Sequence, residues 1–370
     1  MRVGITINTT WNIYNFRRGL IKTLIDEGHD VYAFSPVDEY VQKLTSLGCK
    51  YVCVEMSASG INPLKESGII HRYRQVLKTH KIDILLSYTI KPNIYGTLAA
   101  RSLNIPVLAN VSGLGTVFLW KGWVSAFARR FYHFALKQSA HIFFQNQQDL
   151  LDFTELMPIS KEKMSVIPGS GINLDEYSPA PYDPGDYTVF LMTARLLIEK
   201  GVQEYVLAAE KMKRKYANVQ FKLIGGRDEN HRRAISHEAL QAWIEAGIIE
   251  YTEHSDDIPT HVAKADAVVL PSYREGTSRT LLEGGALGRT LIATRVPGCD
   301  YTVEDGLSGF LCDPKSSDAL FVAMETFHNL SAQDKRKMAQ RSRQHIENKF
   351  DERIVINNYL RKIQDHTLNE

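Results

Sequence analysis

The stretch "DAVVLPSYREGTSRTLLEGGALGRTLIAT" (266–294) reads as strand, loop, helix and strand. An apolar run at 266–272 leads into a polar loop with Gly276, and Thr277 and Ser278 stand where a helix would begin. A second apolar run follows at 290–294. Two short apolar strands joined by a helix are typical of parallel βαβ units, so this stretch predicts an α/β fold.

The same alternation continues on both sides of this stretch. Further strands of the C-terminal half are expected at 188–193, 219–225 and 248–253. In the N-terminal half, strands are expected at 3–7, 30–34, 51–55, 82–87, 106–111 and 141–145, and helices at 15–27, 63–79, 92–103 and 123–138. Strands and helices at this spacing predict parallel sheets that are covered on both faces.

A segment rich in Pro, Gly, Asp and Ser interrupts the pattern at 167–187. With 370 residues the chain has room for two domains. We therefore expect an N-terminal Rossmann-like domain over 1–178 and a C-terminal one over 188–349. A final helical segment over 350–370 could pack back on the N-terminal domain.

Composition narrows the possible partners. The chain holds 44 Lys and Arg and 42 Asp and Glu, a net charge of +2, which argues against nucleic acid as the partner. The charge is uneven, because residues 1–180 hold 19 basic and 14 acidic residues, giving +5, and the remainder 25 and 28, giving −3. The four cysteines have no zinc-ligand spacing and are expected to be reduced thiols of a cytoplasmic protein. We expect no signal peptide and no membrane-spanning segment.

Candidate binding residues follow the strands of the C-terminal half. Arg195 and Lys200 come just after the strand at 188–193 and could clamp a diphosphate. Gly225 and Gly226 follow the strand at 219–225, where a turn without side chains lets the backbone approach a ligand. Ligands of open α/β sheets bind at these carboxyl ends of strands.

Two acids lie eight positions apart in the opening stretch. Glu275 falls in the loop and Glu283 about two turns into the following helix. Gly276 admits close backbone approach, while Thr277 and Ser278 can cap the helix and present amides to an anion. Together with Arg195 and Lys200, this arrangement predicts a nucleotide diphosphate sugar as the ligand. The sequence has no Asp-x-Asp motif near a strand end, so we do not expect a metal ion to hold the diphosphate.

These motifs resemble a known family. "RLLIEKG" (195–201), "PSYREGTSRTLLEGGALGRTLIATRVPG" (271–298), "EDGLSGFLCDP" (304–314) and "VIPGSGINLDEYSP" (166–179) are similar to family 4 retaining glycosyltransferases. The resemblance implies the GT-B fold, two Rossmann-like domains facing across a cleft, and a hexosyltransferase that needs no metal or other cofactor. It also implies that Glu275 is the catalytic residue and contacts the donor sugar, that Glu283 holds the ribose hydroxyls, and that Arg195 and Lys200 bind the diphosphate.

The N-terminal half is similar to a bacterial subgroup that extends undecaprenyl-diphosphate-linked glycans, including N-acetylgalactosaminyltransferases of polysaccharide and protein glycosylation pathways. The similarity rests on "SYTIKPNIYGTLAA" (87–100) and "VSGLGTVF" (111–118). It implies a UDP-sugar donor, with N-acetylhexosamine as the expected sugar, and a lipid-linked glycan acceptor. The expected acceptor or cleft residues are Asn15, Tyr88, Lys91, Asn93 and Gly113.

The chain departs from this family at three places. Residues 8–16, "NTTWNIYNF", lack the Gly-Gly loop of many relatives. Tyr88 stands where many relatives have a His, and Tyr88 could equally be a packed aromatic beside the cleft. Asp300 and Tyr301 replace a commoner Arg-Glu pair.

The stretch "FLWKGWVSAFARRFYHFALK" (118–137) mixes aromatic and basic residues. At helical spacing Trp123, Phe127, Phe131 and Phe134 share one face, and basic residues lie beside it. Such a helix can lie on the inner face of the cytoplasmic membrane as a peripheral anchor, although a core helix with a basic outer face would look similar. The expected membrane residues are Trp120, Lys121, Trp123, Arg129 and Arg130.

Three other functions are possible for a chain with this pattern. A nucleotide-sugar epimerase can share the two-domain fold but would have no acceptor site. A nicotinamide-dependent dehydrogenase would need a G-x-G-x-x-G motif after an early strand, and residues 8–16 contain no glycine. A non-catalytic sugar-nucleotide-binding subunit remains open, although the set of Arg195, Lys200, Glu275 and Glu283 argues for an enzyme.

Overall fold

A computed structural model of the chain describes residues 1–56, 63–114, 123–156, 158–229, 231–255 and 257–367. The chain divides into two units. Unit 1 comprises Met1–Ser170 and Glu352–Glu370, and unit 2 comprises Gly171–Asp351. The division after Ser170 falls inside the predicted connection at 167–187, and the last helix belongs to the first unit.

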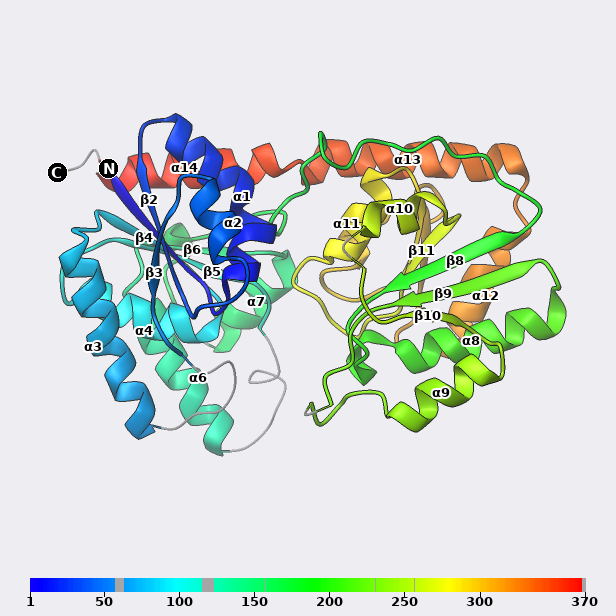
Figure 1. The fold of residues 1–370 in the computed structure, drawn as a ribbon, viewed down its shortest axis with the longest axis horizontal. Coiled ribbons are helices and arrows are strands. Elements are labelled where there is room, and N and C mark those ends of the chain that lie inside the picture. Colours follow the sequence, from blue (N-terminus) through cyan, green and yellow to red (C-terminus); the bar gives the residue numbers. More distant parts are fainter. Residues whose placement is uncertain (57–62, 115–122, 157, 230, 256, 368–370) are drawn as a thin grey trace. The chain divides into compact units, whose positions relative to one another are not determined.

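Unit 1 contains a parallel sheet of seven strands in the order β3-β2-β1-β4-β5-β6-β7 (Figure 1). The strand order reverses between β1 and β4, which pair in parallel with Val3 opposite Ile84. The strands are β1 (Arg2–Thr6), β2 (Asp30–Ser35), β3 (Lys50–Cys53), β4 (Ile84–Tyr88), β5 (Val107–Val111), β6 (His141–Phe144) and β7 (Met164–Val166).

Helices cover both faces of this sheet. One face carries α1, α2 and α14, and the other carries α3, α4 and α6 side by side (Figure 1). The helices are α1 (Thr10–Asp26), α2 (Val41–Ser46), α3 (Pro63–Thr79), α4 (Ile90–Arg101), α6 (Trp123–Leu136), α7 (Gln147–Leu156), the 3₁₀ turn η1 (Lys161–Lys163) and α14 (Glu352–Thr367). Because both faces are covered, β4 and β5 are buried at every position.

Helix α1 begins five residues before the predicted start at residue 15. Thr9 caps it by accepting a hydrogen bond from the backbone N–H of Asn12. The Asp38 carboxylate accepts hydrogen bonds from the N–H groups of Thr10 and Trp11. These caps satisfy amides that would otherwise be unpaired, so a polar stretch without an apolar period still forms helix.

Unit 2 contains a parallel sheet of six strands in the order β10-β9-β8-β11-β12-β13. Here the order reverses between β8 and β11, which pair with Phe190 opposite Ala267. The strands are β8 (Thr188–Thr193), β9 (Val219–Ile224), β10 (Glu250–Thr252), β11 (Ala267–Leu270), β12 (Thr290–Thr294) and β13 (Gly309–Cys312). The sheet is therefore the second Rossmann-like sheet of the chain.

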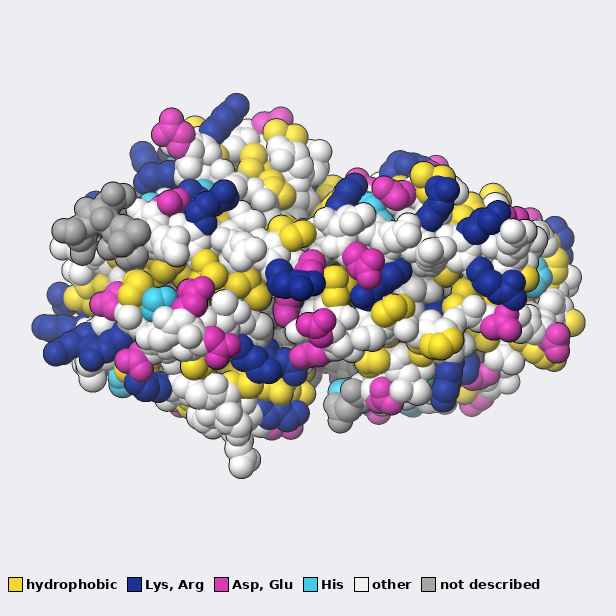
Figure 2. Space-filling view, turned by 90° about the horizontal axis from the view of Figure 1, so that it is seen from above, with side chains coloured by type: hydrophobic (Ala, Val, Ile, Leu, Met, Phe, Trp, Pro, Cys, Tyr) yellow, Lys and Arg dark blue, Asp and Glu magenta, His cyan; other side chains and the backbone are white. Residues whose placement is uncertain are grey.

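The helices of unit 2 also form two layers. Helices α8 and α12 pack together on one side, and α11 packs with α13 and α10 on the other (Figure 1). Where α13 reaches the surface, basic and acidic side chains are intermixed (Figure 2). The helices are η2 (Ile198–Lys200), α8 (Val202–Lys215), α9 (His237–Glu245), α10 (Ile258–Ala263), α11 (Arg279–Ala286), η3 (Asp300–Thr302), α12 (Ser317–His328) and α13 (Ala332–Phe350).

Candidate active site

The carboxyl edge of the unit 2 sheet gathers most of the predicted donor-binding residues. Strands β8 and β11 are neighbours, and the strand order reverses between them. Arg195 and Lys200 follow β8, and Glu275 follows β11. In doubly wound sheets this reversal point is where the crevice for a ligand opens.

Lys200 and Glu275 form an ion pair at this edge. The Lys200 Nζ lies 2.6 Å from the Glu275 Oε1, and the two side chains are 20% and 13% exposed. The loops that carry them are also tied together, because the Glu199 carbonyl accepts hydrogen bonds from the Tyr273 N–H at 2.9 Å and the Ser272 hydroxyl at 3.2 Å. The carboxylate and the ammonium are therefore held in place before any ligand binds.

Arg195 lies close by in sequence but is exposed. Its guanidinium forms no ion pair with any residue in the described part of the chain. A guanidinium without a carboxylate partner is free to bind an anionic ligand in a bidentate manner. Arg195, which follows β8, therefore adds positive charge to the edge of the sheet that also carries the Lys200–Glu275 pair.

The two glycines after β9 have different environments. Gly225 has φ of 154°, and a Cβ at this position would lie 1.8 Å from the Ala194 carbonyl oxygen. The loop after β9 can thus pass against the loop after β8 only because residue 225 has no side chain. Gly226 has no atom within 4 Å of the place where a Cβ would lie. Gly225 is required by packing, and Gly226 borders open space.

The loop after β12 supports the loop that carries Glu275. The Glu275 N–H donates to the Pro297 carbonyl at 3.0 Å, and the Ser278 N–H donates to the Gly298 carbonyl at 3.1 Å. Gly298 has φ of 83°, and a Cβ there would lie 2.3 Å from the Glu275 carbonyl oxygen. Pro297 and Gly298 were not predicted as site residues, although a Pro-Gly pair just after a predicted strand is a recognisable turn signal.

Thr277 and Ser278, which were predicted to cap the helix and present amides to an anion, both use their hydroxyls within the protein. Ser278 caps α11 by accepting a hydrogen bond from the Leu281 N–H at 3.3 Å. The Thr277 hydroxyl is hydrogen-bonded to the Tyr301 hydroxyl, which also donates to the Gly276 carbonyl at 3.4 Å. These two side chains therefore shape the loop, and α11 begins directly after it.

Glu283 lies on α11 in a cluster of its own. Its Oε1 accepts hydrogen bonds from the Arg279 Nε at 2.9 Å and from the Tyr177 hydroxyl at 3.1 Å. Arg279 also donates to the Gly171 carbonyl at 2.9 Å. Burial, and then the negative charge of Glu283, raise the pKa of the Tyr177 phenol. The contact between Tyr177 and Glu283 could not be predicted from a local sequence pattern, because the two residues are 106 positions apart.

No three His, Cys, Asp or Glu side chains in the described ranges lie together as possible metal ligands. The structure also contains no helix, among those it describes, that is long and apolar enough to cross a membrane.

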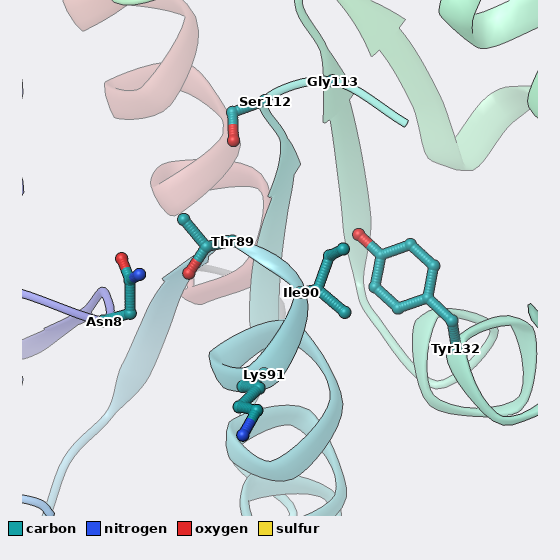
Figure 3. Close-up of a pocket in the computed structure, with 7 residues that line it drawn as sticks. All are labelled: Asn8, Thr89, Ile90, Lys91, Ser112, Gly113 and Tyr132. Atoms are coloured by element: carbon teal, nitrogen blue, oxygen red, sulfur yellow. The ribbon is translucent and has the colours of Figure 1, made fainter. Parts of the chain in front are cut away.

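The corresponding edge of unit 1 contains a cavity of about 280 Å³ (Figure 3). Its lining residues follow the ends of β1, β4 and β5 or come from α6: Asn8, Thr89, Ile90, Lys91, Ser112, Gly113 and Tyr132. Thr89, directly before α4, has φ of 64°, which a β-branched residue rarely adopts. In Figure 3 the Tyr132 hydroxyl points towards Ile90, and the Lys91 side chain extends along α4 away from Ser112.

Of the predicted acceptor residues, two line this cavity, two are buried, and Asn15 lies partly exposed on α1. Lys91 and Gly113 line the cavity. Asn93 is buried and donates to the Asn110 carbonyl at 2.9 Å and to the Tyr132 hydroxyl at 3.2 Å. Asn15 donates to the Trp11 carbonyl one turn earlier in α1. The other lining residues are neutral and were not predicted, although all of them except Tyr132 of α6 lie within a few residues of the end of a predicted strand.

Tyr88 lies in the core of unit 1. It packs against Tyr359 of α14 with the ring centroids 6.0 Å apart, and the Arg17 guanidinium lies 4.2 Å from its ring centroid. Burial raises the pKa of the Tyr88 phenol well above its usual value, so the phenol is neutral at pH 7. Its position matches a packed aromatic rather than a residue that lines the cavity.

Helix α6 presents part of the predicted membrane face to solvent. Arg130 is exposed, Arg129 is half-buried, and the Phe134 side chain is 55% exposed. Phe131 instead packs into the unit 1 core with its ring centroid 6.3 Å from that of Tyr95. The expectation of one continuous aromatic face is therefore wrong at Phe131.

Other parts of that prediction cannot be placed. Trp120 and Lys121 lie outside the described residues, as do the side chains of Trp123 and Phe127.

Two family models together span most of the chain. Residues 15–169 match the "Glycosyl transferase 4-like domain" and residues 175–345 match "Glycosyl transferases group 1".

Curated relatives fall in the same group. The chain is 29% identical to the N,N'-diacetylbacillosaminyl-diphospho-undecaprenol alpha-1,3-N-acetylgalactosaminyltransferase of Campylobacter jejuni, over 100% of this chain and 99% of the relative. It is 23% identical to the UDP-Gal:alpha-D-GlcNAc-diphosphoundecaprenol alpha-1,3-galactosyltransferase of Escherichia coli, over 71% of each chain.

Solved structures show the same fold at low sequence identity. A glycosyltransferase from Rickettsia africae superposes with a TM-score of 0.80 at 19% identity, over 100% of this chain and 99% of the other. Anabaena HepE, solved in complex with UDP and glucose, superposes with a TM-score of 0.81 at 16% identity, over 99% of both chains. With its two Rossmann-like sheets and both family domains in order, the chain belongs to the group 1 and 4-like glycosyltransferases of the GT-B fold.

Proposed function

We propose that this glycosyltransferase moves an N-acetylhexosamine from a UDP-sugar to a polyprenyl-diphosphate-linked glycan, with retention of configuration and without a metal ion. The main observation behind the proposal is the set of charged residues at the edge of the unit 2 sheet where the strand order reverses. This set consists of the Lys200–Glu275 ion pair and Arg195, which has no carboxylate partner in the described chain. This edge holds a carboxylate for a sugar beside cationic groups for a diphosphate.

The diphosphate of the donor binds Arg195 and Lys200. Both can donate charge-assisted hydrogen bonds to phosphate oxygens, and these bonds strengthen as negative charge grows on the leaving group. The N-terminal end of α11, which starts at Arg279, contributes further positive potential. These groups take the place that a divalent metal would have in stabilising the leaving diphosphate.

Glu283 suits the ribose of the nucleotide. Both of its hydrogen bonds within the described chain go to Oε1, from Arg279 and Tyr177. The Oε2 atom is therefore available to accept a hydrogen bond from a ribose hydroxyl. The Arg279 and Tyr177 contacts fix the orientation of the carboxylate.

Glu275 contacts the donor sugar in this proposal, and Lys200 orients it. The bond between the anomeric carbon and the β-phosphate oxygen breaks, and the acceptor hydroxyl oxygen bonds to the anomeric carbon on the same face. The acceptor proton passes to the departing diphosphate oxygen. Glu275 thus stabilises the positive charge that develops on the sugar ring, and it does not act as one of the two carboxylates of a glycosidase.

The acceptor assignment is supported by the relatives and by unit 1. The names of both curated relatives specify a glycan on diphospho-undecaprenol. The unit 1 cavity has polar walls from Asn8, Thr89 and Ser112, and the exposed Arg130 and Phe134 of α6 suit a lipid surface. We therefore propose that the protein acts on the inner face of the cytoplasmic membrane as a peripheral protein.

A transfer assay tests the proposal. The full chain is incubated with an undecaprenyl-diphosphate-linked N-acetylhexosamine in detergent and with UDP-GalNAc, UDP-GlcNAc, UDP-Gal, UDP-Glc or GDP-mannose, each with and without EDTA. Mass spectrometry of the lipid fraction follows the product. We expect extension from a UDP-N-acetylhexosamine at the same rate in EDTA.

Three outcomes would contradict parts of this proposal. Transfer from GDP-mannose alone would refute the UDP donor, and loss of transfer in EDTA would refute a metal-free site. Interconversion of two UDP-sugars without extension of the lipid would identify an epimerase.

A further inference from the structure

Tyr301 touches the middle of the loop that carries Glu275. It belongs to the 3₁₀ turn η3. Its hydroxyl is hydrogen-bonded to the Thr277 hydroxyl and donates to the Gly276 carbonyl at 3.4 Å. Gly276 and Thr277 are the two residues directly after Glu275.

The rest of Tyr301 is fixed by α13. Its carbonyl lies 3.0 Å from the Nε2 of the buried His345, whose Nδ1 lies 3.2 Å from a Glu304 carboxylate oxygen. Its ring packs on Phe350 with the centroids 5.4 Å apart. The phenol therefore stands on a rigid support from a different part of the chain, about forty positions later than Tyr301 itself.

Tyr301 contacts this loop at its centre. Backbone hydrogen bonds from Glu275 to Pro297 and from Ser278 to Gly298 anchor its two ends. Between them lies Gly276, whose carbonyl accepts the hydrogen bond from the Tyr301 hydroxyl. The Tyr301 hydroxyl thus contacts the two residues that directly follow Glu275.

We propose that Tyr301 is a positioning residue of the donor loop, which uses its hydroxyl to hold Gly276 and Thr277 so that Glu275 faces the donor sugar. The inference rests on the proposed function. Tyr301 does not contact the leaving diphosphate in this account, so its loss affects the transfer step more than the binding of UDP.

The variant Tyr301→Phe removes the hydroxyl and keeps the ring on Phe350. We expect kcat for transfer to fall about 3- to 10-fold, the range for one lost neutral hydrogen bond, while the affinity for UDP changes less than about 2-fold. We also expect amide hydrogen exchange of the peptide over 271–281 to become faster.

The matched control is Tyr216→Phe. The Tyr216 hydroxyl is also half-buried and hydrogen-bonded, to Glu325 at 3.0 Å, but it lies at the far end of α8, about 20 Å along the helix from Lys200. This control reports the general cost of removing a tyrosine hydroxyl from unit 2, and it should leave both transfer and loop exchange unchanged.

A double-mutant cycle with Thr277→Val shows whether the two hydroxyls act together. If they hold the loop as a pair, Tyr301→Phe combined with Thr277→Val is no slower than the worse single variant. Effects on kcat that multiply would mean that the two hydroxyls act independently, and this would contradict the proposal.

Hydrogen exchange at 271–281 and kcat for transfer test the positioning role of Tyr301 separately from the proposed function. Unchanged exchange at 271–281 in Tyr301→Phe overturns the positioning role, whether or not the wild type transfers a sugar. Faster exchange with unchanged kcat also overturns it, since the loop would then move without consequence. A wild type that transfers nothing refutes the proposed function, and the exchange result still decides whether Tyr301 holds the loop.

Discussion

The first six strands of unit 1 and the six strands of unit 2 have the same order, but the two units differ in the side chains at the point where that order reverses. In unit 2 the reversal between β8 and β11 carries the Lys200–Glu275 ion pair and an exposed Arg195. In unit 1 the reversal between β1 and β4 leads to a cavity lined mainly by neutral side chains, and the Arg17 guanidinium is buried against the Tyr88 ring. The same topology thus provides a charged edge in one unit and a largely uncharged edge in the other.

The difference corresponds to two kinds of ligand. A nucleotide diphosphate needs cations that are already in position, and paired carboxylates keep such cations ordered before the ligand arrives. A cavity with hydroxyl and amide walls suits a glycan, which is recognised through neutral hydrogen bonds. In this account, a Rossmann-like sheet determines where a ligand binds, and the residues after the strands determine which ligand it is.

Replacing Glu275 by Ala should have the largest effect. We expect the transfer rate to fall at least about 100-fold, because the stabilisation of charge on the sugar is lost. The affinity for UDP should stay within about 3-fold of wild type or become tighter, since Lys200 is released to the diphosphate. Steady-state transfer and UDP titration measure the two effects.

A matched control for this variant is Glu210→Ala, which removes an acid paired with Arg214 on the exposed side of α8. If UDP affinity in Glu275→Ala falls together with transfer, Glu275 belongs to the structure of the nucleotide site and not to the sugar site.

Removing the cations of the unit 2 edge tests the charged half of the comparison. Arg195→Ala and Lys200→Ala should each weaken UDP binding about 10- to 100-fold, the range for a lost charge-assisted hydrogen bond. Titration with UDP measures this. Arg214→Ala, at an exposed Arg of α8, is the control. Unchanged UDP affinity in both site variants would refute the diphosphate clamp.

The free energy of unfolding at low pH tests a buried ionisable group of unit 1, His141. Burial and the nearby Lys362 lower the pKa of His141 to about 4, from an ordinary value near 6.5. Between these values the unfolded chain binds a proton that the folded chain does not, so stability is lost as the pH falls from about 6.5 to 4. We expect this group to cost about 2 kcal/mol at pH 4.5 relative to pH 7.

Denaturant unfolding of wild type and His141→Gln at both pH values measures this cost. The variant should lose less stability on acidification, because glutamine has no charge to gain. His237→Gln, at an exposed position in unit 2, should behave as wild type. An equal acid loss in wild type and His141→Gln would contradict the buried neutral imidazole.

The smallest effect concerns the surface of α6. Reversing Arg129 and Arg130 to Glu should weaken binding to vesicles that contain anionic lipid at least about 5-fold at low salt, which corresponds to the roughly 1 kcal/mol of attraction that one exposed basic residue, Arg130, contributes near such a surface. The control reverses Arg336 and Lys337, an adjacent basic pair on α13 of unit 2. Equal binding by both double variants in a sedimentation assay would remove α6 from the membrane surface.

The sequence predicts the sheets better than the site. Strands β8 and β12 and helix α3 have the predicted bounds, because long apolar runs and periods dominate there. Strands β7 and β13 were missed, since runs of three and four residues at a sheet edge carry little apolar signal. The first turn of α1 was missed because capping, not periodicity, starts it.

In the candidate site, Arg195, Lys200 and Glu275 were predicted because they lie in the loops after strands, where ligands of open α/β sheets bind. The partners that orient these charges could not be predicted. Tyr177, Pro297 and Tyr301 reach the site through contacts with residues that are distant in sequence, and no local pattern signals such contacts. The neutral walls of the unit 1 cavity were missed for a related reason, since hydroxyls and amides also follow strands in ordinary turns.

The most direct test of this account is a calorimetric titration of the full chain with UDP, in EDTA and in excess Mg²⁺. The account predicts one site per chain with the same affinity under both conditions, because Arg195 and Lys200 supply the positive charge themselves. Binding that appears only with Mg²⁺ would contradict it, and the charged edge of unit 2 would then need another explanation.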